Sequence, residues 1–292
     1  MGDNLSKPIT EKHTSTFETP LMRVGCCGMQ GWRKNMEDAH VAHLNLAGVR
    51  RNGLFGVFDG HNGYITAKYC GAHMADELLS SPEFEAKNYS TAFEMTFLRI
   101  DEKLMRAPEM RHEGGCTAVC VLIADGQVVC ANAGDSRAVM YRNGKSFALS
   151  EDHKPTLPAE IARIEKAGSK VQNGRVNQVL SLSRAIGDFD FKENPSLPFK
   201  DQAITAFPDV TVSRLSREDA FIVLACDGVW DVLSNEDCCS LVAKTLRDTN
   251  NDVGLVCEAI LDKCLAPAAP GLGCDNMTII VVQFKPAYFE GN

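Results

Sequence analysis

Short apolar runs bounded by turn residues recur along most of the chain, and this pattern predicts β-strands. The run LFGVF at residues 54–58 is typical, because it is apolar throughout and leads directly into Asp-Gly. Runs of this kind occupy residues 22–27, 40–46, 54–58, 116–123, 128–132, 138–142, 145–149, 178–183, 221–226 and 277–284. The chain is therefore expected to be rich in short strands.

Two turns between these runs indicate how the strands are oriented. Asp125-Gly126 joins one pair of runs and Asn143-Gly144 joins another. Both dipeptides favour the positive φ angles of two-residue hairpins. Strands joined by such turns are antiparallel.

Apolar residues spaced three and four apart predict helices in separate blocks. Phe93, Phe97 and Leu104 fall on one stripe, and Thr91 and Glu94 have the spacing of a capping box. We expect helices at residues 64–79, 91–106, 158–167, 236–247 and 255–265. These helices come in pairs between groups of strands, which does not match the strict alternation of a parallel sheet.

This order of elements predicts an α+β fold, a β-sandwich of two antiparallel sheets flanked by helix pairs. Residues 1–20 are polar and show no regular pattern, so we expect an irregular surface arm there. Residues 21–292 contain no linker, repeat or low-complexity segment and are expected to form one domain.

Composition and charge narrow the function classes. The 292 residues are 45% hydrophobic and 23% charged, which is ordinary for a globular protein. The net charge of −8 and the lack of a long Lys/Arg run argue against nucleic acid as a partner. The longest apolar runs have seven residues, whereas a membrane-spanning helix needs roughly 20. The polar N-terminus does not have the pattern of a secretory signal.

The twelve cysteines do not form a recognisable pattern. No Cys-x-x-Cys spacing occurs, and several cysteines lie inside apolar runs, as expected for buried free thiols. We therefore expect a reducing compartment, the cytoplasm or also the nucleus.

Acidic residues stand at the ends of many predicted strands. Each of them alone fits an ordinary turn, since Asp bonds its own backbone and a following Gly accepts positive φ. In a sandwich, however, strand ends gather at two rims, and several carboxylates at one rim would repel one another unless a cation lay between them. The acids are Glu37, Asp38, Asp59, Asp135, Asp227, Asp231 and Asp275.

The ligand types predict which cation would bind. Carboxylate and carbonyl oxygens suit Mg²⁺ or Mn²⁺, and the chain lacks the His-x-His, Cys-x-x-Cys and His-Glu-x-x-His spacings typical of Zn²⁺. A carboxylate can bridge two ions, an arrangement used in phosphoester chemistry.

Eight ordered segments resemble one known family. They are WRKNMEDAH, VFDGHNG, GGCTAVCVLI, NAGDSRAVM, EDHKP, SLSRAIGDFDFK, LACDGVWDVL and CDNMTIIVV. Together they resemble the metal-dependent serine/threonine protein phosphatases, the protein phosphatase 2C family, from about residue 22 to residue 284. The resemblance implies hydrolysis of phosphoserine and phosphothreonine in phosphoprotein substrates by a metal-bridging hydroxide. It also implies two tightly bound Mg²⁺ or Mn²⁺ ions.

The resemblance assigns the acids to that metal site. Asp59 would bridge the two ions, the Gly60 carbonyl would bind one of them, and Asp227 and Asp275 would bind the other. Glu37 and Asp38 would hold metal-bound waters or complete the coordination. Asp135 and Asp231, together with Asp227, would hold a third, looser ion; alternatively they are ordinary turn and cap residues.

The resemblance also assigns two basic residues. Arg33 would receive the substrate phosphate, because a guanidinium pairs with phosphate oxygens; alternatively it is a surface residue beside Trp32. His61 would be the general acid for the leaving alkoxide; alternatively it only hydrogen-bonds a metal-bound water. Residues 184–208 resemble the flap beside the active site of this family.

Two other functions remain open at this stage. A related fold used only for interactions would be expected to lack some of the acids, whereas none is missing here. A two-metal hydrolase of small phosphoesters would use the same residues, so only substrate assays distinguish it.

The first residues suggest a lipid. MGDNLS carries Gly2 and Ser6 in the N-myristoylation pattern, although Asp3 is an unfavourable neighbour. One acyl chain would give weak, reversible membrane association.

Overall fold

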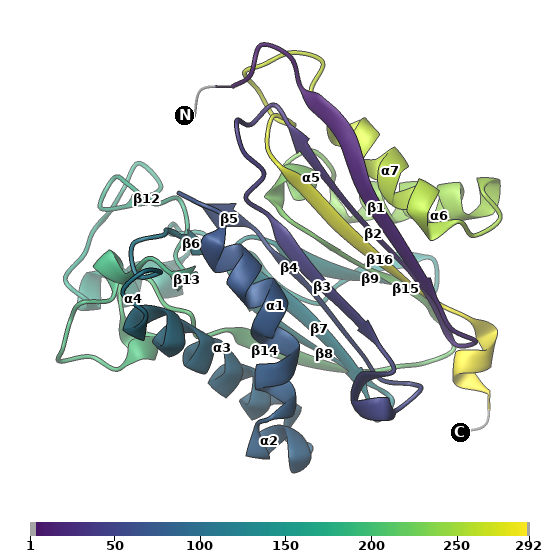
Figure 1. The fold of residues 1–292 in the computed structure, drawn as a ribbon, viewed down its shortest axis with the longest axis horizontal. Coiled ribbons are helices and arrows are strands. Elements are labelled where there is room, and N and C mark those ends of the chain that lie inside the picture. Colours follow the sequence, from purple (N-terminus) through teal and green to yellow (C-terminus); the bar gives the residue numbers. More distant parts are fainter. Residues whose placement is uncertain (1–3, 291–292) are drawn as a thin grey trace.

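Two antiparallel β-sheets pack face to face in the computed structural model, which describes residues 4–290 (Figure 1). The first sheet has the order β1-β2-β16-β15-β9-β10 and the second has the order β14-β8-β7-β4-β3. Helices cover both outer faces, so the predicted class, a β-sandwich of antiparallel sheets flanked by helix pairs, is confirmed.

The strands and helices have the following bounds. The first sheet contains β1 (Ile9–Glu18), β2 (Met22–Gly31), β16 (Met277–Phe284), β15 (Asp219–Ala225), β9 (Arg137–Arg142) and β10 (Lys145–Ala148). The second contains β14 (Asp209–Arg214), β8 (Gln127–Ala133), β7 (Ala118–Ala124), β4 (Gly53–Phe58) and β3 (Ala39–Leu44). Short strands are β5 (Gly60–His61), β6 (Gly115–Cys116), β11 (Val171–Gln172), β12 (Arg175–Val176) and β13 (Ile186–Gly187). The helices are α1 (Ile65–Leu79), α2 (Pro82–Glu85), α3 (Tyr89–Arg106), α4 (Pro158–Lys166), α5 (Asp227–Trp230), α6 (Asn235–Asp248) and α7 (Val253–Cys264).

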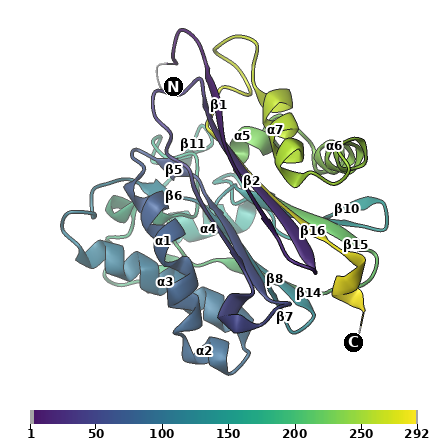
Figure 2. The same cartoon turned by 45° about the vertical axis from the view of Figure 1, so that its right-hand side comes forward.

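Strand β4 shows why its run is apolar throughout. Side chains alternate between the two faces of a strand. Phe55 and Val57 therefore enter the core between the sheets, while Leu54 and Phe58 enter the core under α1 and α3. On the other side of the molecule, α6 and α7 cover the first sheet (Figure 2). The molecule thus has four layers, which are helices, sheet, sheet and helices. An apolar core lies between each two adjacent layers.

The two predicted hairpins are present. Asp125, Gly126, Asn143 and Gly144 all have positive φ angles, as two-residue turns of this type require. The first turn joins β7 to β8 and the second joins β9 to β10, both pairs being antiparallel.

The expectation of an irregular arm is wrong for part of residues 1–20. Ile9–Glu18 forms β1, which pairs antiparallel with β2 at the edge of the first sheet. Its residues are mostly exposed, so the strand lacks the apolar run by which the others were found. The division into an arm and a domain from residue 21 stays a prediction.

Two local predictions also need correction, and one further strand was missed. Residues 178–183 do not form a strand, since Asn177 and Gln178 have positive φ angles that break the extended chain. Helix α3 begins at Tyr89, so Thr91 and Glu94 lie inside it and do not form a capping box. Strand β14 was not predicted, because its side chains are largely exposed at a sheet edge.

Two expectations about cysteines and membrane spans agree with the structure. All twelve cysteines are free and buried. Within residues 4–290, no helix has the length and apolar character needed to cross a membrane.

Candidate active site

The predicted acids meet at one rim of the sandwich because neighbouring strands are antiparallel. Asp59 follows the end of β4, and Asp38 precedes the start of β3, which pairs with β4 through Ala39 and Phe58. In the other sheet, Asp227 follows the end of β15 and Asp275 precedes β16, its antiparallel neighbour. The end of one strand therefore lies beside the start of the next, and both deliver an acid to the same place.

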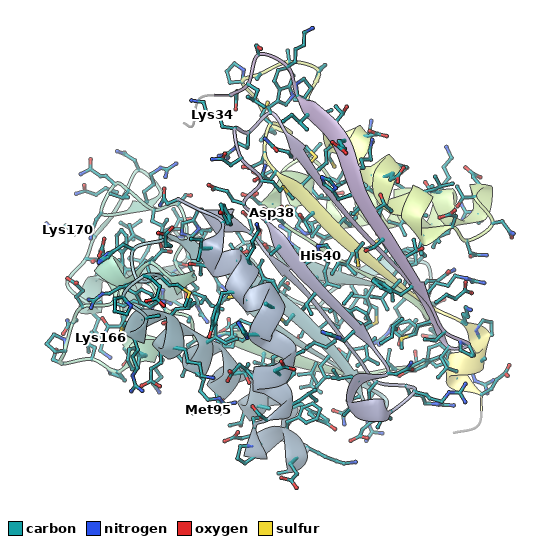
Figure 3. All side chains as sticks on the ribbon, in the orientation of Figure 1. Lys34, Asp38, His40, Met95, Lys166 and Lys170 are labelled. Carbon is teal, nitrogen blue, oxygen red and sulfur yellow. The ribbon has the colours of Figure 1, made fainter. Side chains whose placement is uncertain are left out.

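A cleft of about 400 Å³ opens at this rim. Acids next to the strand ends of both sheets line it, as do residues 180–182. The predicted site residues that line it are Arg33, Glu37, Asp59, Gly60, His61, Asp135, Asp227 and Asp275. Asp38 is not among the lining residues; it is buried directly before β3, where Figure 3 labels it.

Asp38 supplies the clearest sign that a cation belongs here. Its Oδ2 accepts a hydrogen bond from Thr278 Oγ1 at 2.7 Å, but its buried Oδ1 has no partner among the described residues. Ligand atoms of Asp38, Asp59 and Cys226 lie within 4.8 Å of one another. Burial raises the pKa of Asp38 to about 6. A buried, unpartnered carboxylate oxygen beside other acids fits a bound cation.

The neighbouring acids perturb one another in the same way. Burial, followed by the charges of Asp227 and Asp38, raises the pKa of Asp59 well above its usual value. Burial, followed by the charge of Asp135, does the same to Asp227. Ionising each carboxylate therefore costs free energy, because the charge is buried and lies near other acids. A bound divalent cation would offset that cost.

Close backbone approach holds the floor of the cleft together. A Cβ on Gly60 would lie 2.4 Å from the carbonyl oxygen of Glu37, so only glycine fits there. Asn276 Oδ1 accepts a hydrogen bond from Glu37 N at 2.9 Å, and its Nδ2 donates to the carbonyls of Gln30 and Asn35. Asn276 thus ties the Glu37 segment to β16. The sequence analysis missed this role because its partners are distant in the chain.

His61 has a buried partner. Its Nε2 lies 2.7 Å from Asp188 Oδ2, and only 5% of the Asp188 side chain is exposed. Burial lowers the pKa of His61, but the charge of Asp188 and its hydrogen bond outweigh this, so the pKa is raised overall. Asp188 belongs to the segment 184–208, which was singled out as a flap without reference to His61.

Arg33 stands at the mouth of the cleft. Its Nη2 donates to Asp275 Oδ2, and 44% of its side chain is exposed. The preceding Trp32 is buried, and its Nε1 donates to the carbonyl of Ala266 at 3.0 Å. Trp32 therefore fixes the backbone next to Arg33, and the Arg33 side chain lines the cleft.

Comparison with known proteins identifies the family to which this chain belongs. The sequence profile of the family described as "Protein phosphatase 2C" matches residues 22–271. The chain belongs to the protein phosphatase 2C family. It is accordingly a serine/threonine protein phosphatase, as the sequence resemblance predicted.

Similar members of the protein phosphatase 2C family come from a yeast and a plant, and a similar solved structure comes from a protozoan. "Protein phosphatase 2C homolog 2" of Schizosaccharomyces pombe is 44% identical over 97% of this chain and 79% of its own length. "Probable protein phosphatase 2C 11" of rice is 39% identical over 98% of this chain and 91% of its own length. Among solved structures, a phosphatase from Toxoplasma gondii has a TM-score of 0.82 at 27% identity, covering 94% of this chain and 96% of that one.

Asp135 and Asp231, the two acids assigned to a third ion, interact with Asp227 of this phosphatase. Asp231 N donates to the carbonyl of Asp227 at 2.8 Å, so both residues belong to the same short helical turn. Burial raises the pKa of Asp135, while Lys154, whose Nζ donates to Asp135 Oδ2, acts in the opposite direction. The charge of Asp231 raises the pKa of both Asp135 and Asp227. The sequence analysis did not identify Lys154, which stands in the segment EDHKP.

The N-myristoylation prediction at Gly2 lies outside the described residues.

Proposed function

We propose that this phosphatase removes phosphate from serine and threonine residues of proteins with the help of two tightly bound Mg²⁺ or Mn²⁺ ions. The observation that carries the proposal is the group of carboxylates at one rim, with the unpartnered Oδ1 of Asp38 among them. Asp59, the carbonyl of Gly60, Asp227 and Asp275 would hold the ions. Glu37 and Asp38 would complete the coordination or hold waters on it. When bound, such ions make a water more acidic and neutralise phosphate charge.

The protein's own residues would position and protonate the substrate. Arg33 lies at the cleft mouth, where its guanidinium can exchange Asp275 for two phosphate oxygens. His61 would donate a proton to the departing seryl or threonyl oxygen, a role that suits an imidazole whose pKa is raised. Asp188 would orient the ring through its 2.7 Å contact.

The open cleft favours a protein substrate. Its wall at residues 180–182 includes Leu180 and Leu182, which can contact the chain on either side of a phosphorylated residue. The segment 184–208 would contribute through Asp188, which contacts His61. A non-enzymatic interaction module is disfavoured because the set of acids is complete.

Two further features belong to the same proposal. Asp135, Asp227 and Asp231 would hold a third, looser ion, because their charges act on one another at the edge of the cleft. A lipid at Gly2 would add weak membrane association to a cytoplasmic or nuclear location. An unmodified N-terminus in the intact mass of protein from its native cell would exclude the lipid.

The proposed function is tested by removing the bridging carboxylate. In Asp59→Asn, turnover of a phosphoserine peptide should fall by orders of magnitude, because both ions lose a ligand. Binding of Mn²⁺, measured by calorimetry, should weaken as well. Asp76→Asn is a matched control, because Asp76 is an exposed acid on α1, and it should behave like the unmodified protein.

Two outcomes would contradict the proposal. Full activity in chelator-treated protein would exclude the metal-dependent mechanism. A much higher kcat/KM for a small aryl phosphate than for phosphopeptides would favour a hydrolase of small phosphoesters.

A further inference from the structure

The loop between β10 and α4 is fastened to the turn that carries Asp135. His153 N donates to the carbonyl of Gly134 at 2.9 Å, and Gly134 N donates in return to His153 Nδ1 at 3.2 Å. Asn132 Nδ2 donates to the carbonyl of Glu151 at 2.9 Å. These bonds join the two segments at both ends of the contact, so the backbone leading into Lys154 has little freedom.

A second set of contacts holds the same loop from the other side. Arg137 on β9 makes a bidentate pair with Asp152, with distances of 2.8 and 2.7 Å. His153 Nε2 lies 3.1 Å from Asp209 Oδ2 at the start of β14. The three residues that precede Lys154 are therefore all anchored to the sheets. Glu151 is held by Asn132, Asp152 by Arg137, and His153 by Gly134 and Asp209. Its position beside Asp135 follows from the fold rather than from a chance surface contact.

Lys154 points its ammonium at Asp135. Nζ donates to Oδ2 of Asp135, whose side chain is 5% exposed, while 41% of the Lys154 side chain is exposed. Asp227 and Asp231 also act on Lys154 through their charges. The ammonium therefore pairs with one of the three acids proposed to hold the third ion and interacts electrostatically with the other two.

An ammonium and a divalent cation cannot occupy this place together without strong repulsion, because like charges a few ångströms apart raise each other's energy. The exposed side of Lys154 leaves its flexible stem free to swing toward solvent, while its backbone stays anchored. Two arrangements of the same site follow, one closed by Lys154 and one holding the ion.

We propose that Lys154 competes with the third divalent cation for Asp135 and thereby sets the cation concentration at which the third ion binds. This inference rests on the third ion of the proposed function. If the site binds the ion only when Lys154 has left, its apparent affinity is reduced by the fraction of molecules in which Lys154 is away. The two tightly bound ions are expected to change much less, because the ion pair of Lys154 is with Asp135, which is not one of their proposed ligands.

The experiment compares three variants of the full chain. Lys154→Met keeps the length of the stem and removes the charge, whereas Lys154→Arg keeps the charge. Lys166→Met is the control for net charge, because Lys166 lies on α4 and pairs with Asp201 instead of Asp135. Bound Mn²⁺ is counted by electron paramagnetic resonance as its concentration is raised.

The third Mn²⁺ should bind roughly fivefold more tightly to Lys154→Met, the factor expected when a partly exposed ion pair is removed from the competition. Lys154→Arg and Lys166→Met should resemble the unmodified protein, and the two tight ions should be unchanged in all of them. In chelator, Lys154→Met should melt at a lower temperature, because Asp135 loses its partner, and should gain more on addition of Mn²⁺.

The outcomes separate this inference from the proposed function. If the unmodified protein binds three ions and Lys154→Met binds the third with the same affinity, the competition is excluded while the third ion stands. If neither protein binds more than two ions at any concentration, the third ion is excluded and the competition with it. Circular dichroism of each variant with Mn²⁺ shows that it is folded.

Discussion

At the scale of single residues, the most informative contact joins His61 to Asp188. The two are 127 positions apart, and their side chains meet because β6 pairs with both β5 and β13. The sequence pointed to His61 as an acid but offered no partner for it. Lys154 and Asn276 are similar cases, since each acts on a predicted site residue from a segment that local patterns do not connect to it.

The pair of His61 and Asp188 gives a prediction about pH. Asp188 raises the pKa of His61, so the imidazole keeps its proton to higher pH than it would alone. In Asp188→Asn this support is lost, and the alkaline limb of kcat for a phosphoserine peptide should move to lower pH. Hydrolysis of an aryl phosphate should change much less, because its leaving group needs no acid.

Steady-state pH profiles with both substrates check this prediction. His61→Gln supplies the limiting case, in which the alkaline limb should disappear for the peptide. An equal loss on both substrates, with an unchanged pH profile, would mean that Asp188 only supports the structure.

At the scale of elements, a buried ion pair joins helix α4 to Arg184, at the start of the segment 184–208. Glu160 accepts from Arg163 at 2.8 Å and from Arg184 at 2.9 Å, and its side chain is 3% exposed. Burial raises the pKa of Glu160, but the two guanidinium groups outweigh this and hold it at about 2. Its contribution to stability is therefore present above pH 4.5 and is lost only as the pH falls through about 2.

Glu160→Ala should lower the free energy of unfolding by about 3 kcal/mol, because it leaves buried guanidinium groups without their carboxylate. Urea unfolding at pH 7 measures this loss. Glu165→Ala on the same helix is the matched control, since Glu165 is exposed, and its effect should stay within about 0.5 kcal/mol. Equal values for the two variants would show that the Glu160 network adds no stability.

At the scale of the whole molecule, the cluster of acids opposes folding when no cation is bound. Burial raises the pKa of Asp38 to about 6, and burial together with neighbouring acids raises those of Asp59 and Asp227 well above their usual range. In the unfolded chain these groups titrate near pH 4. The folded form therefore binds more protons between these values, and its stability falls as the pH rises through them.

Chelator-treated protein should accordingly show a melting temperature that falls between pH 4 and pH 6, and added Mn²⁺ should abolish this fall. Asp38→Asn should weaken the dependence, because one of the titrating carboxyl groups is gone. Differential scanning calorimetry at several pH values measures it. A melting temperature that rises over this range in chelator would contradict the expected charge repulsion at the rim.

The sequence alone determined the central strands, the two hairpins and most helices, because these depend on local apolar periodicity and on turn residues with positive φ. It failed at β1 and β14, whose exposed side chains carry no such pattern. Residues 178–183 were apolar enough to suggest a strand, but they lie in a loop beside the cleft.

The acids at strand ends were also visible in the sequence, but their meeting at one rim was decided by the pairing of the strands. Antiparallel neighbours bring the end of one strand beside the start of the next, so Asp59 and Asp38 meet although no local pattern joins them. Only the packing of loops onto that rim placed Asp188 against His61 and Lys154 against Asp135. Such contacts depend on the path of the whole chain, whereas a strand or a turn depends on a few adjacent residues.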